Sequence, residues 1–510
     1  MQNLPDKLYT VDSIVQLEQI AINQFGIPAY TLMKHAGEAV FSVIQKKYPQ
    51  CKNILVLCGA GNNAGDGYVV AKLARQANYN VHVISLIDAA TLKNEALLAY
   101  QDWLSVGDSV GGNDVVDKAL INDADIIVDA LLGTGLTREV TGEWAQWIAS
   151  VNASIKPVIS VDIPSGLIAN TGVISAHAIQ ADVTVSFIGL KQGMFTAQGK
   201  DVCGEIMFND LNVPAEAYQQ VECEAHLLKE INYSLLPIRK ASSNKGCFGH
   251  VLIIGGNTGM PGAVILAAKA ALRTGAGLVT IITVHDNLAA ISCAVPEAMI
   301  KTCDIDSLAE VFSAQLLNSV THIAVGMGLG QDDWSLAILR YCARLNKPML
   351  IDADALNLIA QQKITIKSFL LGSSIVITPH PGEAARLLSQ ETSLSSADIQ
   401  QNRFDAVKKL HRLFNNSESC VVVLKGSGTL IFDGQLLEVC SKGSAAMAAP
   451  GMGDVLSGII IALLAQRIKI SDAVQLGVCL HATAAQSVTQ DKTRGLLASD
   501  VVKALPRILL

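Results

Sequence analysis

The amino-acid sequence predicts an α/β protein with two domains, each built as three layers in which helices cover both faces of a parallel sheet. Its 510 residues exceed what one hydrophobic core usually supports. Half of the residues are apolar and only 16% are charged, a composition typical of large cores around buried parallel strands. Short apolar runs also alternate with helical patterns along most of the chain, as they do in βαβ units.

The N-terminal half begins with two amphipathic helical stretches, over residues 11–24 and 31–47. Further helices are predicted over 66–77 and 92–104. Because a strand, a glycine-rich turn and a helix follow one another near residue 60, we expect a Rossmann-like α/β/α domain over residues 1–220. The strands are predicted where short runs are apolar throughout, over 53–58, 81–87, 125–132, 157–163 and 182–187.

The alternation lapses between residues 211 and 244, where Pro214, Pro237 and a polar run interrupt it. We therefore predict a linker near 215–235 and a second α/β/α domain over 225–510. Its helices are predicted over 263–274, 335–345 and 453–466. Its strands are predicted over 250–255, 278–283, 322–325, 348–352, 374–378 and 420–425.

The overall charge and the cysteines limit the class of function. A formal net charge of −7 argues against a protein that coats nucleic acid. No apolar run is long enough to span a bilayer, and the first residues lack the basic and apolar regions of a signal peptide. Eleven cysteines without a C-x-x-C pair are typical of reduced thiols in the cytosol. We expect a cytoplasmic protein that acts on small molecules, without membrane or nucleic-acid partners, and forms a homo-oligomer.

Polar, glycine-rich segments follow three predicted strands of the N-terminal half, at 59–67, 129–136 and 162–166. The first reads G-A-G-N-N-A-G-D-G, in which Asn62, Asn63 and Asp66 have oxygens suited to a hard cation or to ribose and phosphate groups. A turn that uses asparagine for left-handed backbone would explain that segment alone. Ligands bind at the carboxyl ends of strands in open α/β sheets, so three such segments at three strand ends favour a site.

These segments, together with D-A-L-L-G-T-G and D-I-P-S-G, resemble the YjeF N-terminal domain family, the NAD(P)HX epimerases, over about residues 10–215. Ala64 stands where that family usually has glycine. The resemblance implies a potassium ion held by Asn63, Asp129 and Ser165. A carboxylate such as Asp162, near C6 of the hydrated nicotinamide ring, would assist the loss and return of water as a catalytic group. The implied substrate contacts are Asn62, Asn63, Ala64, Gly65, Asp66, Gly133, Thr134, Gly135, Leu136, Thr137, Arg138, Glu139 and Asp162.

The C-terminal half carries a second set of strand-end segments. Two glycine-rich loops lie at 255–263 and 326–330. In T-P-H-P-G-E, His380 lies between two prolines after a predicted strand, which is a rigid presentation, although a lone histidine is more often structural. Lys425 begins K-G-S-G-T, which supplies a lysine and backbone donors where a nucleotide phosphate or ribose would lie.

The strongest signal is P-G-M-G-D-V-L-S-G at 450–458, which begins an apolar helix. Free amides at the start of this helix would stabilise a phosphoryl group, while Asp454 takes a proton from an attacking hydroxyl. The alternative is that Asp454 only caps the helix. Glycines on both sides of the segment favour anion binding over capping alone.

The G-x-G-D helix start resembles the ribokinase superfamily. With G-N-T-G-M-P-G-A, G-M-G-L-G, D-A-D-A-L-N and T-P-H-P-G-E, it more narrowly resembles the ADP-dependent NAD(P)HX dehydratase domain, over about residues 235–505. The resemblance implies that ADP phosphorylates the C6 hydroxyl with Asp454 as base, that phosphate then leaves, and that magnesium bridges the phosphates. The implied substrate contacts are Ala263, Gly328, His380 and Asp454. ADP would lie on Lys425, Gly426, Ser427, Gly428, Thr429 and Gly453.

The two resemblances together imply a ribokinase-like second domain and a bifunctional enzyme for hydrated NAD(P)H. It would interconvert (R)- and (S)-NAD(P)HX and dehydrate the (S) form with ADP, giving NAD(P)H, AMP and phosphate. An ATP-dependent kinase of a small alcohol is one alternative, against which the histidine of T-P-H-P-G-E and the epimerase-like half argue. A non-catalytic N-terminal scaffold is the other, and it would not need Asn63, Asp129, Asp162 and Ser165. A preference between NADHX and NADPHX stays open.

Overall fold

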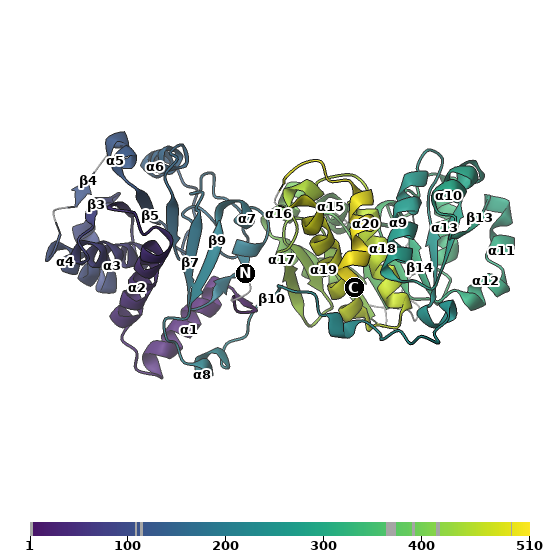
Figure 1. The fold of residues 1–510 in the computed structure, drawn as a ribbon, viewed down its shortest axis with the longest axis horizontal. Helices are drawn as coiled ribbons and strands as arrows, with labels where there is room; N and C mark the ends of the chain where they lie inside the picture. Colours follow the sequence, from purple (N-terminus) through teal and green to yellow (C-terminus); the bar gives the residue numbers. More distant parts are fainter. Residues whose placement is uncertain are drawn as a thin grey trace. The chain divides into compact units, whose positions relative to one another are not determined.

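The computed structural model describes residues 4–107, 110–112, 116–363, 374–389, 393–414, 419–490 and 492–509. The chain divides into two compact units, Met1–Leu227 and Leu228–Leu510 (Figure 1). The division falls within the segment predicted as a linker, which also holds the short helix α8 (Ala215–Tyr218) and the strand β10 (Ala225–Leu228). None of the helices in the described part of the chain is long and apolar enough to cross a membrane.

Unit 1 contains a parallel sheet of seven strands in the order β4-β3-β2-β5-β6-β7-β9. The edge strands β4 and β9 were not predicted, because one is a pair of glycines and the other is too exposed to form an apolar run. A small ribbon, β10-β1-β8, lies apart from this sheet. The strands are β1 (Lys7–Tyr9), β2 (Asn53–Cys58), β3 (Asn80–Ser85), β4 (Gly111–Gly112), β5 (Ile126–Ala130), β6 (Val158–Val161), β7 (Val183–Phe187), β8 (Leu190–Lys191) and β9 (Glu205–Asn209).

Helices cover both faces of the unit 1 sheet. The chain moves one way from β2 to β4 and the other way from β5 to β9, and right-handed crossovers therefore put their helices on opposite faces. One core contains side chains of α1 to α4, and the other contains side chains of α5 and α6. The helices are α1 (Val11–Asn23), α2 (Ala29–Lys47), α3 (Asn62–Gln76), α4 (Asn94–Leu104), α5 (Lys118–Asp123), α6 (Gly142–Asn152) and α7 (Gly199–Val202).

Unit 2 repeats this design with the strand order β13-β12-β11-β14-β15-β16-β17-β18-β19. The strands up to β17 are parallel, whereas β18 pairs antiparallel with β17, and β19 pairs antiparallel with β18. The order in which successive strands are added reverses between β11 and β14. The strands are β11 (His250–Ile254), β12 (Leu278–Thr283), β13 (Met299–Thr302), β14 (His322–Val325), β15 (Met349–Ile351), β16 (Ser374–Ile377), β17 (Ser419–Leu424), β18 (Thr429–Phe432) and β19 (Leu437–Cys440).

One face of the unit 2 sheet packs against α9, α10, α18, α19 and α20, whose side chains share a core with alternate strand residues such as Ile253 and Ala324. Strand residues of the other parity, such as Leu252 and Ile323, are equally buried, so the opposite face is covered too. Both units are therefore three-layer α/β/α domains, as predicted. The helices are α9 (Pro261–Thr274), α10 (Leu288–Ala294), α11 (Leu308–Val311), α12 (Ala314–Ser319), α13 (Asp333–Cys342), α14 (Ala353–Ala360), α15 (Pro381–Leu388), α16 (Ser396–Gln401), α17 (Arg403–Phe414), α18 (Met452–Ala465), α19 (Ile470–Thr489) and α20 (Ala498–Leu509).

Helices α9 and α18 approach closely at Gly458. A Cβ placed there would lie 2.2 Å from the carbonyl oxygen of Ala267, so the two backbones would have to move apart. We expect Gly458→Ala to lower the free energy of unfolding of unit 2 by about 1–3 kcal/mol, measured by urea denaturation. Gly262→Ala, in the first turn of α9 where a Cβ would meet nothing within 4 Å, is the matched control and should not destabilise. Equal stability of the two variants would contradict the close approach.

Two candidate active sites

The first site lies where the strand order of unit 1 reverses, between the parallel neighbours β2 and β5. The loops that follow these two strands separate there, which is where open α/β sheets bind ligands. Gly59 allows the loops to start close together, because a Cβ on it would lie 1.9 Å from the carbonyl oxygen of Leu131. A cavity of about 600 Å³ opens beyond this point, lined by residues of α1, α2 and α3 and of the loops after β5, β6 and β7.

Helix α3 begins at Asn62, four residues before the predicted start at Asp66. The prediction that the glycine-rich turn continues up to Asp66 is therefore wrong. Gly61, with φ +84°, ends the turn, and the polar residues that follow form the first helical turn. Asn62, Asn63 and Asp66 line the cavity. The intervening Ala64 and Gly65 are buried, and a Cβ on Gly65 would strike the side chain of Met33 on α2. One face of this helical turn therefore lines the cavity, and the other face packs in the core.

The loop after β5 supplies the opposite wall of the cavity. Its six predicted contact residues from Gly133 to Arg138 all line the cavity. Glu139 lines an adjoining pocket of about 250 Å³, which shares Leu132, Leu136 and Arg138 with the first. The segment predicted from sequence as one binding loop therefore lines two neighbouring pockets.

Asp162 lies at the end of β6 with φ +64°, a left-handed conformation that is uncommon outside glycine, asparagine and aspartate. Its Oδ1 accepts hydrogen bonds from the amide of Phe187, at 3.0 Å, and from the Nζ of Lys191. The Lys191 side chain is buried and also donates to Ser186 Oγ and to the Phe187 carbonyl, each at 3.1 Å. Asp162 and Lys191 both line the cavity, so a carboxylate and an ammonium group face one ligand space. Sequence reasoning missed Lys191.

Three further carboxyl groups line this cavity, those of Asp66, Glu18 and Glu95. Burial raises the pKa of Asp66 well above its usual value, and the nearby Asp162 and Glu18 raise it further while Lys191 opposes them. Burial also raises the pKa of Glu18, again with a contribution from Asp162. A carboxyl group whose pKa is raised holds a proton more readily, so Asp66 can donate one beside the Asp162–Lys191 pair.

The three predicted potassium ligands lie close together, with Asn63 lining the cavity and Asp129 and Ser165 fully buried. Ser165 Oγ donates to Asp129 Oδ1 at 2.5 Å, and Asp129 Oδ2 accepts from Ser160 Oγ at 2.7 Å. Asn63 Nδ2 and Ser165 Oγ both reach the carbonyl oxygen of Leu132, at 3.3 and 3.2 Å. Asp129 is fully buried, and burial raises its pKa although these hydroxyl groups oppose the shift. The structure therefore brings the three residues together around one oxygen-rich spot.

The second site lies at the corresponding reversal in unit 2, between β11 and β14. Here Gly255 allows the close approach, because its Cβ would lie 2.1 Å from the carbonyl oxygen of Met327. Buried Asn257 joins the two loops by donating to the Leu329 carbonyl at 3.0 Å. A Cβ on Gly328 would lie 3.0 Å from that of Ala263, so these two predicted substrate contacts are neighbours.

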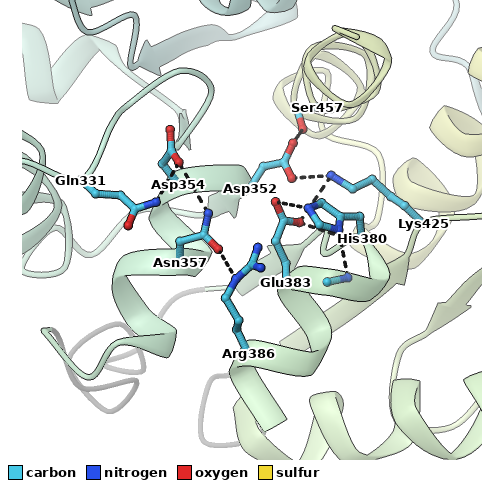
Figure 2. A network of polar contacts seen from close by, with 10 residues as sticks. Gln331, Asp352, Asp354, Asn357, His380, Glu383, Arg386, Lys425 and Ser457 are labelled. Carbon is cyan, nitrogen blue, oxygen red and sulfur yellow. Dashed lines mark hydrogen bonds and ion pairs between the residues drawn. The ribbon is translucent and has the colours of Figure 1, made fainter. Parts of the chain in front are cut away.

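A polar network joins the ends of β15, β16 and β17 (Figure 2). Lys425 Nζ donates to Asp352 Oδ1 at 2.7 Å, and Ser457 Oγ of α18 donates to Asp352 Oδ2 at 2.8 Å. Glu383 on α15 lies 3.9 Å from the Lys425 ammonium and 3.2 Å from the Nε2 of His380. Burial alone would lower the pKa of Lys425, but Asp352 and Glu383 raise it and keep the lysine cationic.

Predicted substrate and ADP residues meet at the start of α18. Gly451, in a left-handed conformation, precedes the helix, so Asp454 lies in the first turn and the capping interpretation is wrong. A Cβ on Gly453 would lie 3.3 Å from Lys425 Nζ, which joins the helix start to the loop 425–429. Burial raises the pKa of Asp454 to about 7, with Asp352 adding to the shift and Lys425 opposing it. Such a carboxyl group is matched to general-base chemistry near neutral pH.

Sequence reasoning assigned no role to Asp352 or Glu383, although both lie in the motifs that carried the resemblance. The available signal was position, since each directly follows or lies near the end of an apolar strand. Lys191 gave a different signal, because a lysine within an apolar stretch is rarely buried without a partner. The partners themselves are remote in sequence, as Asp352 and Ser457 are 105 residues apart.

Comparison with known proteins matches both halves of the chain. Residues 251–507 match the family described as NAD(P)H-hydrate dehydratase, and residues 29–193 match the YjeF-related protein N-terminus. The bifunctional NAD(P)H-hydrate repair enzyme Nnr of Escherichia coli K12 is 39% identical over 510 residues, covering 99% of this chain and 95% of the relative. The enzyme of that name from Vibrio cholerae is 40% identical, with 99% of each covered. A solved Bacillus subtilis ADP/ATP-dependent NAD(P)H-hydrate dehydratase is 28% identical, with a TM-score of 0.47, covering 54% of this chain and 94% of that one.

Two α/β/α units, each with a polar site where its strand order reverses, define an α/β enzyme with two separate sites. Both family models match, and relatives are similar over almost the whole length of the chain. The chain belongs to the family of bifunctional NAD(P)H-hydrate repair enzymes. The family resemblance predicted from the motifs is thereby confirmed.

Proposed function

We propose that this protein repairs hydrated NAD(P)H with both of its units. Unit 1 interconverts the (R) and (S) forms of NAD(P)HX, and unit 2 converts the (S) form to NAD(P)H with ADP, releasing AMP and phosphate. The observation that carries the proposal is that each unit has ionisable groups suited to its step at the ligand-binding edge of its sheet. The membership of the chain in the repair-enzyme family supports it.

For the epimerase step we propose that Asp162 assists the departure and return of water at C6. The C6–O bond breaks as the ring nitrogen supplies electrons, and the leaving hydroxide needs a proton. Asp66, whose pKa is raised by burial, supplies that proton, while the Asp162–Lys191 pair orients and deprotonates the water that returns on the other face. Contacts with Asn62, Asn63 and Asp66 and along 133–139 would hold the nucleotide.

A potassium ion fits the oxygens around Leu132, and we propose that Asn63, Asp129 and Ser165 hold it. All three offer hard oxygen ligands, and a monovalent cation would offset the buried charge of Asp129. When bound, the ion supplies a fixed positive charge that keeps the loops after β2, β5 and β6 together. The reacting groups belong to Asp162, Lys191 and Asp66.

For the dehydration step we propose that Asp454 takes the proton of the C6 hydroxyl as its oxygen attacks the β-phosphorus of ADP. The bond between that phosphorus and the bridging oxygen breaks, and AMP leaves. Phosphate is a better leaving group than hydroxide, so the C6–O bond then breaks, a proton leaves C5, and the ring double bond returns. Lys425 and the amides at the start of α18 stabilise the charge on the transferred group. The substrate would lie against Ala263, Gly328 and His380.

Magnesium, when bound, would neutralise the diphosphate oxygens of ADP. The described residues include no group of three or more His, Cys, Asp or Glu side chains placed to hold a metal alone. Mg²⁺ typically takes one or two carboxylates and completes its shell with phosphates and water. We therefore propose that most of its ligands come from the nucleotide itself.

The test is the absorbance at 340 nm after the purified protein is added to both NADHX epimers, first with ADP and then with ATP. We expect full recovery of NADH absorbance with ADP. Recovery that stops at the (S) fraction would remove the epimerase assignment and keep the dehydratase. No recovery with either nucleotide would overturn the repair function and favour a kinase of a small alcohol.

The pH dependence of dehydration gives a sharper test of Asp454. A base acts in its ionised form, so kcat/KM should fall about tenfold per pH unit below a pKa near 7. Asp354 helps to raise the pKa of Asp454, so Asp354→Asn should move this acid limb to lower pH. The measurement is kcat/KM for NADHX at saturating ADP between pH 5 and 9, which spans the pKa by roughly two units each way. An acid limb that stays in place in the variant would remove Asp454 as its origin.

A further inference from the structure

Arg403 is a fully buried arginine at the start of α17, beneath the loop that joins β17 to β18. That loop contains residues 425–429, where the proposed function places ADP. The β17 and β18 strands both contact α17, so the helix lies directly behind the loop. Full burial of an arginine is uncommon and requires an extensive set of hydrogen bonds.

The guanidinium of Arg403 holds the loop by its backbone. Nη2 donates to the carbonyl oxygens of Leu424, Lys425 and Gly428, at 3.2, 3.3 and 3.2 Å. Nη1 donates to Gln400 Oε1 at 2.8 Å, which fixes the plane of the group. One planar cation therefore joins the end of β17 to the residue just before β18.

These hydrogen bonds also decide where the loop amides point. In a planar trans peptide the C=O and the following N–H point in opposite directions. Because the Lys425 carbonyl points to Arg403, the N–H of Gly426 points away from the guanidinium. Gly426 has φ +137°, and a Cβ on it would lie 2.7 Å from Arg403 Nη1. The loop is thus packed tightly onto the guanidinium.

Arg403 also places a positive charge behind the loop. Burial lowers its pKa to about 10, which leaves the group cationic at neutral pH. A fixed cation beneath outward-pointing amides is a favourable environment for an anionic phosphate in front of them.

We propose that Arg403 is a positioning residue for the diphosphate of ADP, acting through the backbone of residues 424–428. The proposal rests on the assignment of ADP to this loop. Removing the guanidinium releases three carbonyls and lets the Gly426 amide turn, so the loss falls on nucleotide binding. The proposed contacts of the hydrated nicotinamide at Ala263 and Gly328 belong to other loops and should stay as they are, as should the site of unit 1.

The experiment is steady-state kinetics of the full chain carrying Arg403→Met, Arg403→Lys or Gln400→Ala. For Arg403→Met we expect the KM for ADP to rise about ten- to hundredfold, with the KM for (S)-NADHX and the epimerase rate unchanged. Arg403→Lys keeps the charge but not the fork, and should fall between wild type and Arg403→Met. Gln400→Ala should raise the KM for ADP a few fold. Lys409→Met, at an exposed cation of the same helix, is the control and should leave the KM for ADP as in wild type.

A KM for ADP at the wild-type value in a folded Arg403→Met chain would overturn the proposal, as would an equal loss for ADP and NADHX. If Arg403→Met lacks the unfolding transition of unit 2, the variants Arg403→Lys and Gln400→Ala test the proposal instead. For them too, a KM for ADP at the wild-type value, or an equal loss for ADP and NADHX, would overturn it. Wild-type protein that recovers no NADH with ADP contradicts the proposed function itself. That result is separate from any difference between variants.

Discussion

Asp454→Asn is expected to abolish dehydration of hydrated NAD(P)H while leaving epimerisation intact. The amide has nearly the same shape as the carboxyl group but cannot accept the proton of the C6 hydroxyl. Loss of a general base costs about 10²- to 10⁴-fold in kcat. Because burial and Asp352 disfavour a charge at this position, a neutral amide should not destabilise the start of α18.

Recovery of absorbance at 340 nm with ADP measures this effect, and the change in the ratio of the two NADHX epimers reports unit 1 in the same sample. Asp333→Asn is the matched control, since Asp333 also lies in the first turn of a helix but is exposed. It should leave both rates at the wild-type value. Dehydration that persists in Asp454→Asn at a rate near wild type would remove Asp454 as the base.

Asp162→Asn is expected to give the reverse result, in which epimerisation is lost and dehydration of the (S) form is retained. Asparagine tolerates the left-handed backbone that Asp162 adopts, so the loop should keep its conformation. The variant removes the carboxylate that pairs with buried Lys191. It therefore changes the proton transfers at C6. The expected loss is about 10²- to 10⁴-fold in the rate of epimerisation.

The readout for Asp162→Asn is NADH recovery from a mixture of both epimers, which should stop at the (S) fraction over a time in which wild type recovers the whole. Asp88→Asn serves as the control, because Asp88 is exposed and caps a short helix by accepting from the Ala90 amide at 3.0 Å, a role asparagine can fill. Full recovery in Asp162→Asn would assign the chemistry to another group of the cavity. Asp66 would then be the first to replace.

Much of the fold could be predicted because its determinants are local. Apolar runs of strand length and amphipathic helical repeats follow from which side chains a buried parallel sheet requires. The same principle explains the omissions. Strand β9 is half-exposed, and β4 consists of Gly111 and Gly112, so neither carries the apolar signal of a buried strand. The early start of α3 at Asn62 was missed because asparagine and glycine are common in turns as well as in first helical turns.

For the candidate sites too, one part could be predicted from the sequence and another part could not. Glycine-rich strand ends could be predicted as binding loops, because close approach of a backbone to a ligand requires glycine at particular positions. Which side chains meet there could not be predicted. Lys191 pairs with Asp162, and Lys425 with Asp352, across 29 and 73 residues of chain. Arg403 was not selected at all, because from sequence it is one more cation on an amphipathic helix.

The sequence by itself determined the two-domain α/β organisation, the strand-end loops and the residues whose chemistry suits a hydrated nucleotide, since these depend on local composition and spacing. Only the tertiary structure decided the protonation properties of Asp66 and Asp454, the cation facing Asp162, and the buried support under the loop at Lys425. The physical reason is that a pKa and a hydrogen bond depend on burial and on neighbours a few ångströms away. Neighbours of that kind are brought together by the sheet order, which no local segment of the chain specifies.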